Sequence, residues 1–134
     1  MILADSSVLI EYYRPRGNTA VQDAVAAAIA NDSVAVNGII QVEILGFAGS
    51  ERERSMLAAD FSAFHWLSLG SKEFALAADL GFRLRRQGLT VPATDLIIAA
   101  SAISSRAELM HSDSHFRQIA TISDLVCRDP LGAT

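Results

Sequence analysis

The sequence of 134 residues has little cysteine, lysine or proline, and it has no long apolar run. Its one cysteine, Cys127, excludes an internal disulfide and a zinc site built from several thiolates, so we expect a reducing, cytoplasmic setting. No apolar stretch approaches the roughly 20 residues of a membrane span. Asp5 interrupts the first apolar residues, and no basic segment precedes them, so we expect no secretion signal.

The chain carries a net negative charge, while its basic residues are almost all arginine. A net charge of −4 and a pI near 5.2 argue against a protein that coats nucleic acid by bulk electrostatics. Ten of the eleven basic residues are arginines, with tight groups at Arg14/Arg16, Arg52/Arg54 and Arg83/Arg85/Arg86. The planar guanidinium group of arginine binds phosphate oxygens well, but it also forms ordinary ion pairs with carboxylates. Each arginine group by itself therefore predicts only a solvated surface.

Strand-like and helix-like periods alternate along the chain, which predicts an α/β sandwich with a mostly parallel sheet. The length fits one domain over residues 1–134. The predicted strands are Ile2–Asp5, Val34–Val36, His65–Leu69, Leu109–His111 and the edge strand Leu125–Cys127. The predicted helices are a short helix through Tyr13, Thr19–Ala30, Gly38–Phe47, a helix capped by Ser50, Ser71–Gln87, Ala93–Ser105 and Ser114–Ala120.

Two of these helices carry predictions about burial. The Gly38–Phe47 segment is apolar on most of its surface, which predicts a buried helix. The amphipathic Ser71–Gln87 segment is expected to stop at Gly88. Its apolar spacing predicts four inward residues, which are Phe74, Ala78, Gly81 and Phe82.

Four carboxylates interrupt apolar segments. Asp5 follows the first strand and Asp113 follows the Leu109–His111 strand, whereas Glu43 interrupts an apolar helix and Asp95 opens one. Each has an ordinary explanation, because the aspartates could cap helices and Glu43 could pair with an arginine. The carboxyl ends of parallel strands share one sheet edge, so Asp5 and Asp113 are expected to lie together there. Asp95 and Glu43 can join them from neighbouring helices.

Four ionised carboxylates at one edge would not persist without a cation. Like charges about 5 Å apart repel by roughly 3 kcal/mol per pair at an effective dielectric constant near 20. Oxygen ligands select Mg²⁺ or Mn²⁺ over zinc. Such a centre suits phosphodiester cleavage by a metal-activated water. The cation would also offset the acidity, so that the arginine groups could hold the flanking nucleic-acid backbone.

Four segments together resemble one known family. They are MILADSSVLIEYY around Asp5, IIQVEIL around Glu43, LRRQGLTVPATDLIIAASAI around Asp95 and HSDSHFRQIA around Asp113. In this order they resemble the PIN domain, specifically the VapC-type ribonuclease toxins of bacterial toxin–antitoxin pairs. The resemblance covers essentially the whole chain.

The resemblance implies a three-layer α/β/α fold and a Mg²⁺- or Mn²⁺-dependent endoribonuclease, a hydrolase that cuts structured RNA, often transfer RNA. It implies catalytic and metal-binding roles for Asp5, Glu43, Asp95 and Asp113. It also implies a homodimer and inhibition by a cognate VapB-type antitoxin. The C-terminal segment of such an antitoxin wraps the toxin and can place an arginine in the acidic crevice.

Two positions depart from the family pattern. Many members carry Thr or Ser two residues before the last aspartate and a second acid two residues after it, where this chain has His111 and His115. His111 is expected to be an ordinary hydrogen-bonded side chain, with metal ligation as the alternative. Ser6 and Ser7 are expected to cap the first helix, which leaves Asp5 for the metal.

Three alternatives stay open at this point. A phosphatase of the haloacid dehalogenase type also begins with an aspartate after its first strand, but Ser7 stands where its second acid belongs. A response-regulator receiver needs a lysine late in the sheet, and Lys72 is the only lysine. A PIN-like domain that only binds RNA is the third, and the presence of all four acids counts against it.

Overall fold

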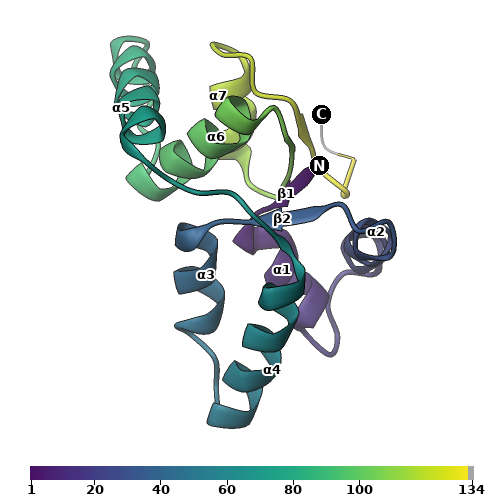
Figure 1. Cartoon of the computed structure of the whole chain (residues 1–134). Coiled ribbons are helices and arrows are strands. Elements are labelled where there is room, and N and C mark those ends of the chain that lie inside the picture. The colour runs from purple at the N-terminus through teal and green to yellow at the C-terminus, as the bar shows by residue number, and fades with distance from the viewer. Residues whose placement is uncertain (133–134) are drawn as a thin grey trace.

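The computed structural model describes residues 1–132, in which five parallel strands form one sheet accompanied by seven helices (Figure 1). The strand order is β3-β2-β1-β4-β5, and each neighbouring pair is parallel. The strands are β1 (Ile2–Ala4), β2 (Val34–Val36), β3 (His65–Trp66), β4 (Glu108–Met110) and β5 (Cys127–Arg128). The helices are α1 (Ser6–Tyr13), α2 (Thr19–Ala30), α3 (Gly38–Leu45), α4 (Glu51–Ala63), α5 (Ser71–Arg86), α6 (Ala93–Ser105) and α7 (Ser114–Ala120).

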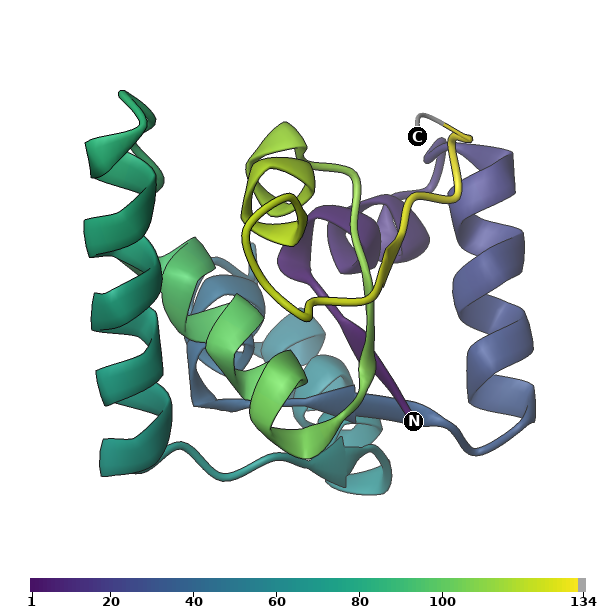
Figure 2. The same cartoon turned by 90° about the horizontal axis from the view of Figure 1, so that it is seen from above.

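Helices cover both faces of the sheet. In Figure 1, α1, α3 and α4 lie below the strands, whereas α6 and α7 lie above them. The helices α2 and α5 stand at opposite flanks of the molecule (Figure 2). The predicted three-layer α/β/α fold with a parallel sheet is therefore confirmed. Within residues 1–132, no helix combines the length and apolar character needed to cross a bilayer.

The sheet is short and its centre is deeply buried. In the central strand β1, Leu3 and Ala4 are fully enclosed, and Leu3 is in register with Ala35 on one side and Leu109 on the other. The outer strands are shorter than predicted. β3 ends at Trp66 rather than Leu69, and β5 comprises Cys127–Arg128 at the predicted edge. Apolar residues near these strands extend the core beyond the strand ends.

The prediction that Gly38–Phe47 is a buried helix is wrong for one face. The helix α3 ends at Leu45, and it buries Ile40 and Ile44 against the core. Val42 is 66% exposed and Phe47, beyond the helix end, is 83% exposed. Because α3 packs on one side only, high mean hydropathy did not distinguish its core face from its open face.

The predicted inward face of α5 is also wrong. The helix buries Ala77, Leu80 and Leu84, whereas Phe74 is 48% exposed and Phe82 is 61% exposed. The exposed face includes the predicted Ala78 as well, and Gly81 is the predicted residue that meets α6. A Cβ atom at Gly81 would lie 2.8 Å from Cδ1 of Leu96, so glycine permits this close approach. The helix α5 therefore has two apolar stripes. The stripe with Leu80 and Leu84 is buried where α5 packs against α6, and the stripe with Phe74 and Phe82 is exposed. The helix ends as predicted before Gly88, whose φ is +78°.

Candidate metal centre

The first and last predicted acids follow neighbouring strands at the same sheet edge. Ala4 at the end of β1 is in register with Met110 at the end of β4. The backbone N–H of Asp5 donates to the carbonyl of Met110 at 3.0 Å, so the ladder continues to Asp5. Asp113 follows three residues after Met110. The predicted meeting of these two strand ends is confirmed.

Asp5 is both buried and the N-cap of α1. Its side chain is held by Ser7, whose backbone N–H donates to Oδ2 at 3.1 Å and whose hydroxyl donates at 2.6 Å. The residue is only 5% exposed. The prediction that Ser6 and Ser7 would cap this helix is wrong, because α1 already begins at Ser6 and Asp5 is the last extended residue.

Ser7 joins the two strand ends, a role that the sequence did not indicate. Its Oγ donates to Asp5 and accepts a 2.9 Å hydrogen bond from the backbone N–H of Ser112. Ser112 directly precedes Asp113, so one hydroxyl fixes the turn after β1 against the loop after β4. A serine two residues after a strand-end acid is the only sequence signal for this contact.

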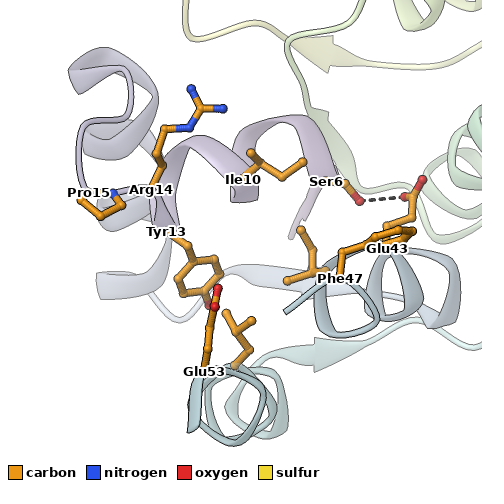
Figure 3. A pocket seen from close by; sticks show the side chains of 10 residues that line it. Ser6, Ile10, Tyr13, Arg14, Pro15, Glu43, Phe47 and Glu53 are labelled. Atoms are coloured by element: carbon orange, nitrogen blue, oxygen red, sulfur yellow. Dashed lines mark hydrogen bonds between the residues drawn. The ribbon is translucent and has the colours of Figure 1, made fainter. Parts of the chain in front are cut away.

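Glu43 approaches the same region from α3. The hydroxyl of Ser6 donates to its Oε1 at 2.7 Å, which ties α3 to the start of α1 (Figure 3). Among the described residues, no arginine forms an ion pair with Glu43, so the alternative that Glu43 pairs with an arginine does not hold. The Glu43 carboxylate is instead oriented by a neutral donor, the hydroxyl of Ser6.

Asp95, Asp113 and His115 form the most compact group. Asp95 is the third residue of α6, whose N-cap is Pro92, so its carboxylate does not cap that helix. Its Oδ2 lies 2.9 Å from Nδ1 of His115. Asp113 caps α7 by accepting from the backbone N–H of His115, and its Oδ1 also lies 3.3 Å from Nδ1. The three side chains offer ligand atoms within 4.8 Å of one another.

The four acids influence one another electrostatically. Burial raises the pKa of Asp5 to about 6, its hydrogen bonds from Ser7 lower it, and the Asp95 and Glu43 carboxylates raise it. Burial also raises the pKa of Asp95, against the hydrogen bond from His115, while the Asp113 and Glu43 carboxylates raise it further. In both residues burial is the largest cause of the raised pKa, and the neighbouring carboxylates add to it, so a divalent cation would favour the ionised forms.

His111 lies beside this group, and its contacts indicate a structural role. It is 1% exposed, its Nδ1 accepts from the backbone N–H of Asp113 at 3.1 Å, and its ring packs 5.2 Å from that of Phe116. Burial lowers its pKa, which favours the neutral ring. His111 is therefore the ordinary hydrogen-bonded side chain expected from the sequence, and His115 is the histidine that joins the acids.

A groove of about 520 Å³ opens beside Glu43 between α1, α3 and α4 (Figure 3). Its walls are mostly apolar, and Glu43 and Glu53 contribute carboxylates to them. The remaining lining residues are Ser6, Ile10, Tyr13, Arg14, Pro15, Ile44, Phe47 and Leu57. The exposed face of α3 and the neighbouring Phe47 thus border a hollow next to the acidic group.

The sequence of the chain matches a known family model. The model described as PIN domain matches residues 2–122. The chain belongs to the PIN-domain family. Nucleases of this family are metal-dependent, and the acidic group of this PIN domain could hold a metal ion. The resemblance drawn from the four acidic segments is thereby confirmed.

Curated relatives align with most of this PIN-domain chain. VapC ribonuclease Mb1587 from Mycobacterium bovis is 32% identical over 129 residues, which cover 93% of this chain and 96% of the relative. Ribonuclease VapC11 from Mycobacterium tuberculosis strain H37Rv has the same identity and coverage. These relatives place the chain with VapC ribonucleases within the PIN-domain family.

Two solved structures share the fold. FitAcB from Neisseria gonorrhoeae has a TM-score of 0.80 at 22% identity, covering 99% of this chain and 100% of that one. VapBC2 from Rickettsia felis, bound to a DNA fragment from its promoter, has a TM-score of 0.75 at 19% identity. The match covers 96% of this chain and 98% of that one. The family membership decides against the phosphatase and receiver alternatives, whose folds and motifs belong elsewhere.

Proposed function

We propose that this chain is a divalent-metal-dependent endoribonuclease and the toxin of a toxin–antitoxin pair. The observation that carries the proposal is the acidic centre at the sheet edge of a PIN domain, where Asp95 and Asp113 meet beside the buried Asp5. The full-length similarity to VapC ribonucleases supports it. The domain over residues 1–134 works as one nuclease unit, with Mg²⁺ or Mn²⁺ as its cation.

We assign the four acids different roles in binding the cation and in activating the water. Asp95 and Asp113 offer the most closely spaced carboxylate oxygens. Asp5, fixed by Ser7, would contribute a buried carboxylate, and Glu43, oriented by Ser6, is the carboxylate to which we assign the acceptance of a proton from the attacking water. When bound, the cation lowers the pKa of that water and neutralises the charge that develops on the phosphodiester.

The substrate we propose is structured cellular RNA, including transfer RNA. Phosphates need positive charge near an acidic centre, and the arginine groups are its source in this chain. Arg14 lines the groove that also contains Glu43, so its group is the one we assign to the RNA backbone. Arg14, Arg54 and Arg83 each also pair with a nearby acid, which is Glu11, Glu51 and Asp79 respectively.

The groove between α1, α3 and α4 suits the C-terminal segment of a VapB-type antitoxin. Its apolar walls, with the exposed Phe47 and Ile10, match the apolar face of a helix. Glu43 and Glu53 in the same groove match a basic side chain, and an arginine reaching Glu43 would enter the acidic centre. Occupation of this groove therefore blocks the nuclease by charge and by volume.

The exposed apolar face of α5 suits a homodimer. Phe74 and Phe82 project from it beside hollows lined by Leu96 and Ala93 of α6. A second copy of the chain has the same exposed apolar face on α5. A two-fold symmetric contact between the two copies would therefore bury both faces. Light scattering on Phe82→Asp tests this contact, since a monomer is expected from the variant and a dimer from the wild-type chain.

The proposed nuclease activity is tested with a structured RNA, divalent metal and one variant. We expect cleavage in Mg²⁺ or Mn²⁺, none in excess EDTA, and none from Asp95→Asn with an unchanged circular dichroism spectrum. Asp79→Asn is the matched control, because this exposed aspartate on α5 lies outside the centre. Full activity of Asp95→Asn or cleavage in excess chelator would refute the proposal. RNA binding without cleavage would favour the binding-only alternative.

A further inference from the structure

His115 stands where the family pattern places a second acid after Asp113. Its Nδ1 lies 2.9 Å from Oδ2 of Asp95 and 3.3 Å from Oδ1 of Asp113. Ligands bonded at about 2.1 Å and at right angles are about 3 Å apart, so both contacts of Nδ1 have the spacing of neighbouring ligands around one ion. The three side chains together offer ligand atoms that lie within 4.8 Å of one another.

The local structure holds this arrangement in place. Asp113 accepts from the backbone N–H of His115, so the carboxylate and the ring are fixed at the same turn. Asp95 comes from α6, which packs against α7. His115 is only partly buried, which leaves its ring accessible to an ion from solvent.

We propose that His115 ligates the divalent cation through Nδ1 and makes the centre favour Mn²⁺ over Mg²⁺. The proposal rests on the proposed function, because it concerns the same metal centre. Mg²⁺ prefers oxygen ligands and retains its waters, whereas first-row transition ions accept imidazole nitrogen. Replacing an acid by a neutral ring also removes one negative charge, which weakens Mg²⁺ binding in particular because that interaction is electrostatic.

Calorimetric titration of the full chain with Mn²⁺ and with Mg²⁺ tests the preference. His115→Gln is expected to weaken Mn²⁺ binding by about tenfold or more and Mg²⁺ binding by less. His115→Asp restores the acid and is expected to strengthen Mg²⁺ binding and reduce the preference. His65→Gln is the matched control, because His65 lies on β3 and contacts Asp32, away from the acidic centre. The Mn²⁺ and Mg²⁺ affinities of this variant should equal those of the wild type.

Pulsed electron paramagnetic resonance of the Mn²⁺-loaded chain tests the ligand itself. Directly bonded imidazole gives a ¹⁴N coupling, which we expect in the wild type and in His65→Gln and not in His115→Gln. A wild-type spectrum without this coupling would overturn the proposal, and so would a coupling that persists in His115→Gln. The wild-type measurement decides the point even if one variant fails to fold.

The two proposals fail in different ways. Metal-dependent RNA cleavage by a wild-type chain without a nitrogen ligand would leave the nuclease function standing and refute the role of His115. Equal changes in Mn²⁺ and Mg²⁺ affinity in His115→Gln would mean that the ring only balances charge against Asp95 and Asp113, which also refutes it. A wild-type chain that binds neither cation would refute both.

Discussion

Hydrogen bonding and burial act in opposite directions on Asp5. Two donors from Ser7 favour its ionised form, while a nearly complete loss of solvent favours the protonated form, and burial dominates. Since the folded-state pKa of about 6 exceeds the ordinary value of 3.8, the metal-free fold is favoured at low pH and loses stability as the pH rises through 6.

Asp5→Asn is therefore expected to stabilise the metal-free protein at pH 7.5 by up to about 3 kcal/mol while abolishing RNA cleavage. The stability difference should become small at about pH 3, where Asp5 is mostly protonated in both the folded and the unfolded state. Urea denaturation in EDTA at the two pH values measures it. Asp23→Asn, at an exposed position on α2, is the control and should change neither quantity. A variant less stable than the wild type at pH 7.5 would contradict the assigned cost of burial.

Ser7→Ala removes the hydroxyl hydrogen bond that lowers the pKa of Asp5, whereas the hydrogen bond from the backbone N–H of residue 7 remains. The pKa of Asp5 should therefore rise further, and the midpoint of metal binding with pH should move to higher pH. Loss of the contacts to Asp5 and Ser112 should also cost about 1–3 kcal/mol of stability. Calorimetric titration with Mn²⁺ across pH 5–8.5 measures the midpoint. Ser62→Ala on α4 is the control, and an unshifted midpoint in Ser7→Ala would count against the role of Ser7.

At the scale of the element, α5 shows how a helix can carry two apolar stripes. One stripe, with Leu80 and Leu84, is fully buried, while the other, with Phe74 and Phe82, remains exposed. α5 packs against α6, so contacts on one side decide which stripe joins the core. The larger side chains lie on the exposed stripe, which makes size a misleading guide to burial here.

Truncation on the two stripes should lower the free energy of unfolding by very different amounts. Leu84→Ala is expected to destabilise the fold by about 2–5 kcal/mol, because it leaves a cavity between α5 and the core. Phe82→Ala removes a larger side chain and should cost less than about 1 kcal/mol in the monomer. Urea unfolding at low protein concentration compares them. A larger loss in Phe82→Ala would place the core face of α5 where the sequence first predicted it.

The strand ends were predictable from the sequence, whereas side-chain contacts between elements were not. Asp5 and Asp113 each follow an apolar strand, and parallel pairing alone brings such residues to one edge. The contact of His115 with Asp95 depends on how α6 and α7 approach each other, about which periodicity says nothing. Likewise, only tertiary packing decides that Ser6 orients Glu43 and Ser7 meets Ser112.

For the molecule as a whole, cation binding and folding should be coupled, because the acids come together only in the folded chain. At a free Mn²⁺ concentration of 100 times Kd, the fold should gain about 2.7 kcal/mol, or about 10 °C in Tm. Thermal unfolding followed by circular dichroism with Mn²⁺ or EDTA measures the shift. Asp95→Asn should lose most of it, and a full shift in that variant would show that the stabilising ion binds elsewhere.

The bond between Ser7 and Ser112 joins residues 105 positions apart, and this separation has a consequence for biosynthesis. At typical elongation rates Asp113 leaves the peptidyl-transferase centre roughly 5–20 s after Asp5. During that interval β1 can pair with β2, but its other neighbour, β4, has not been made. The acidic centre therefore cannot assemble on the nascent chain before β4 and the residues that follow it, Asp113 and His115, have been synthesised.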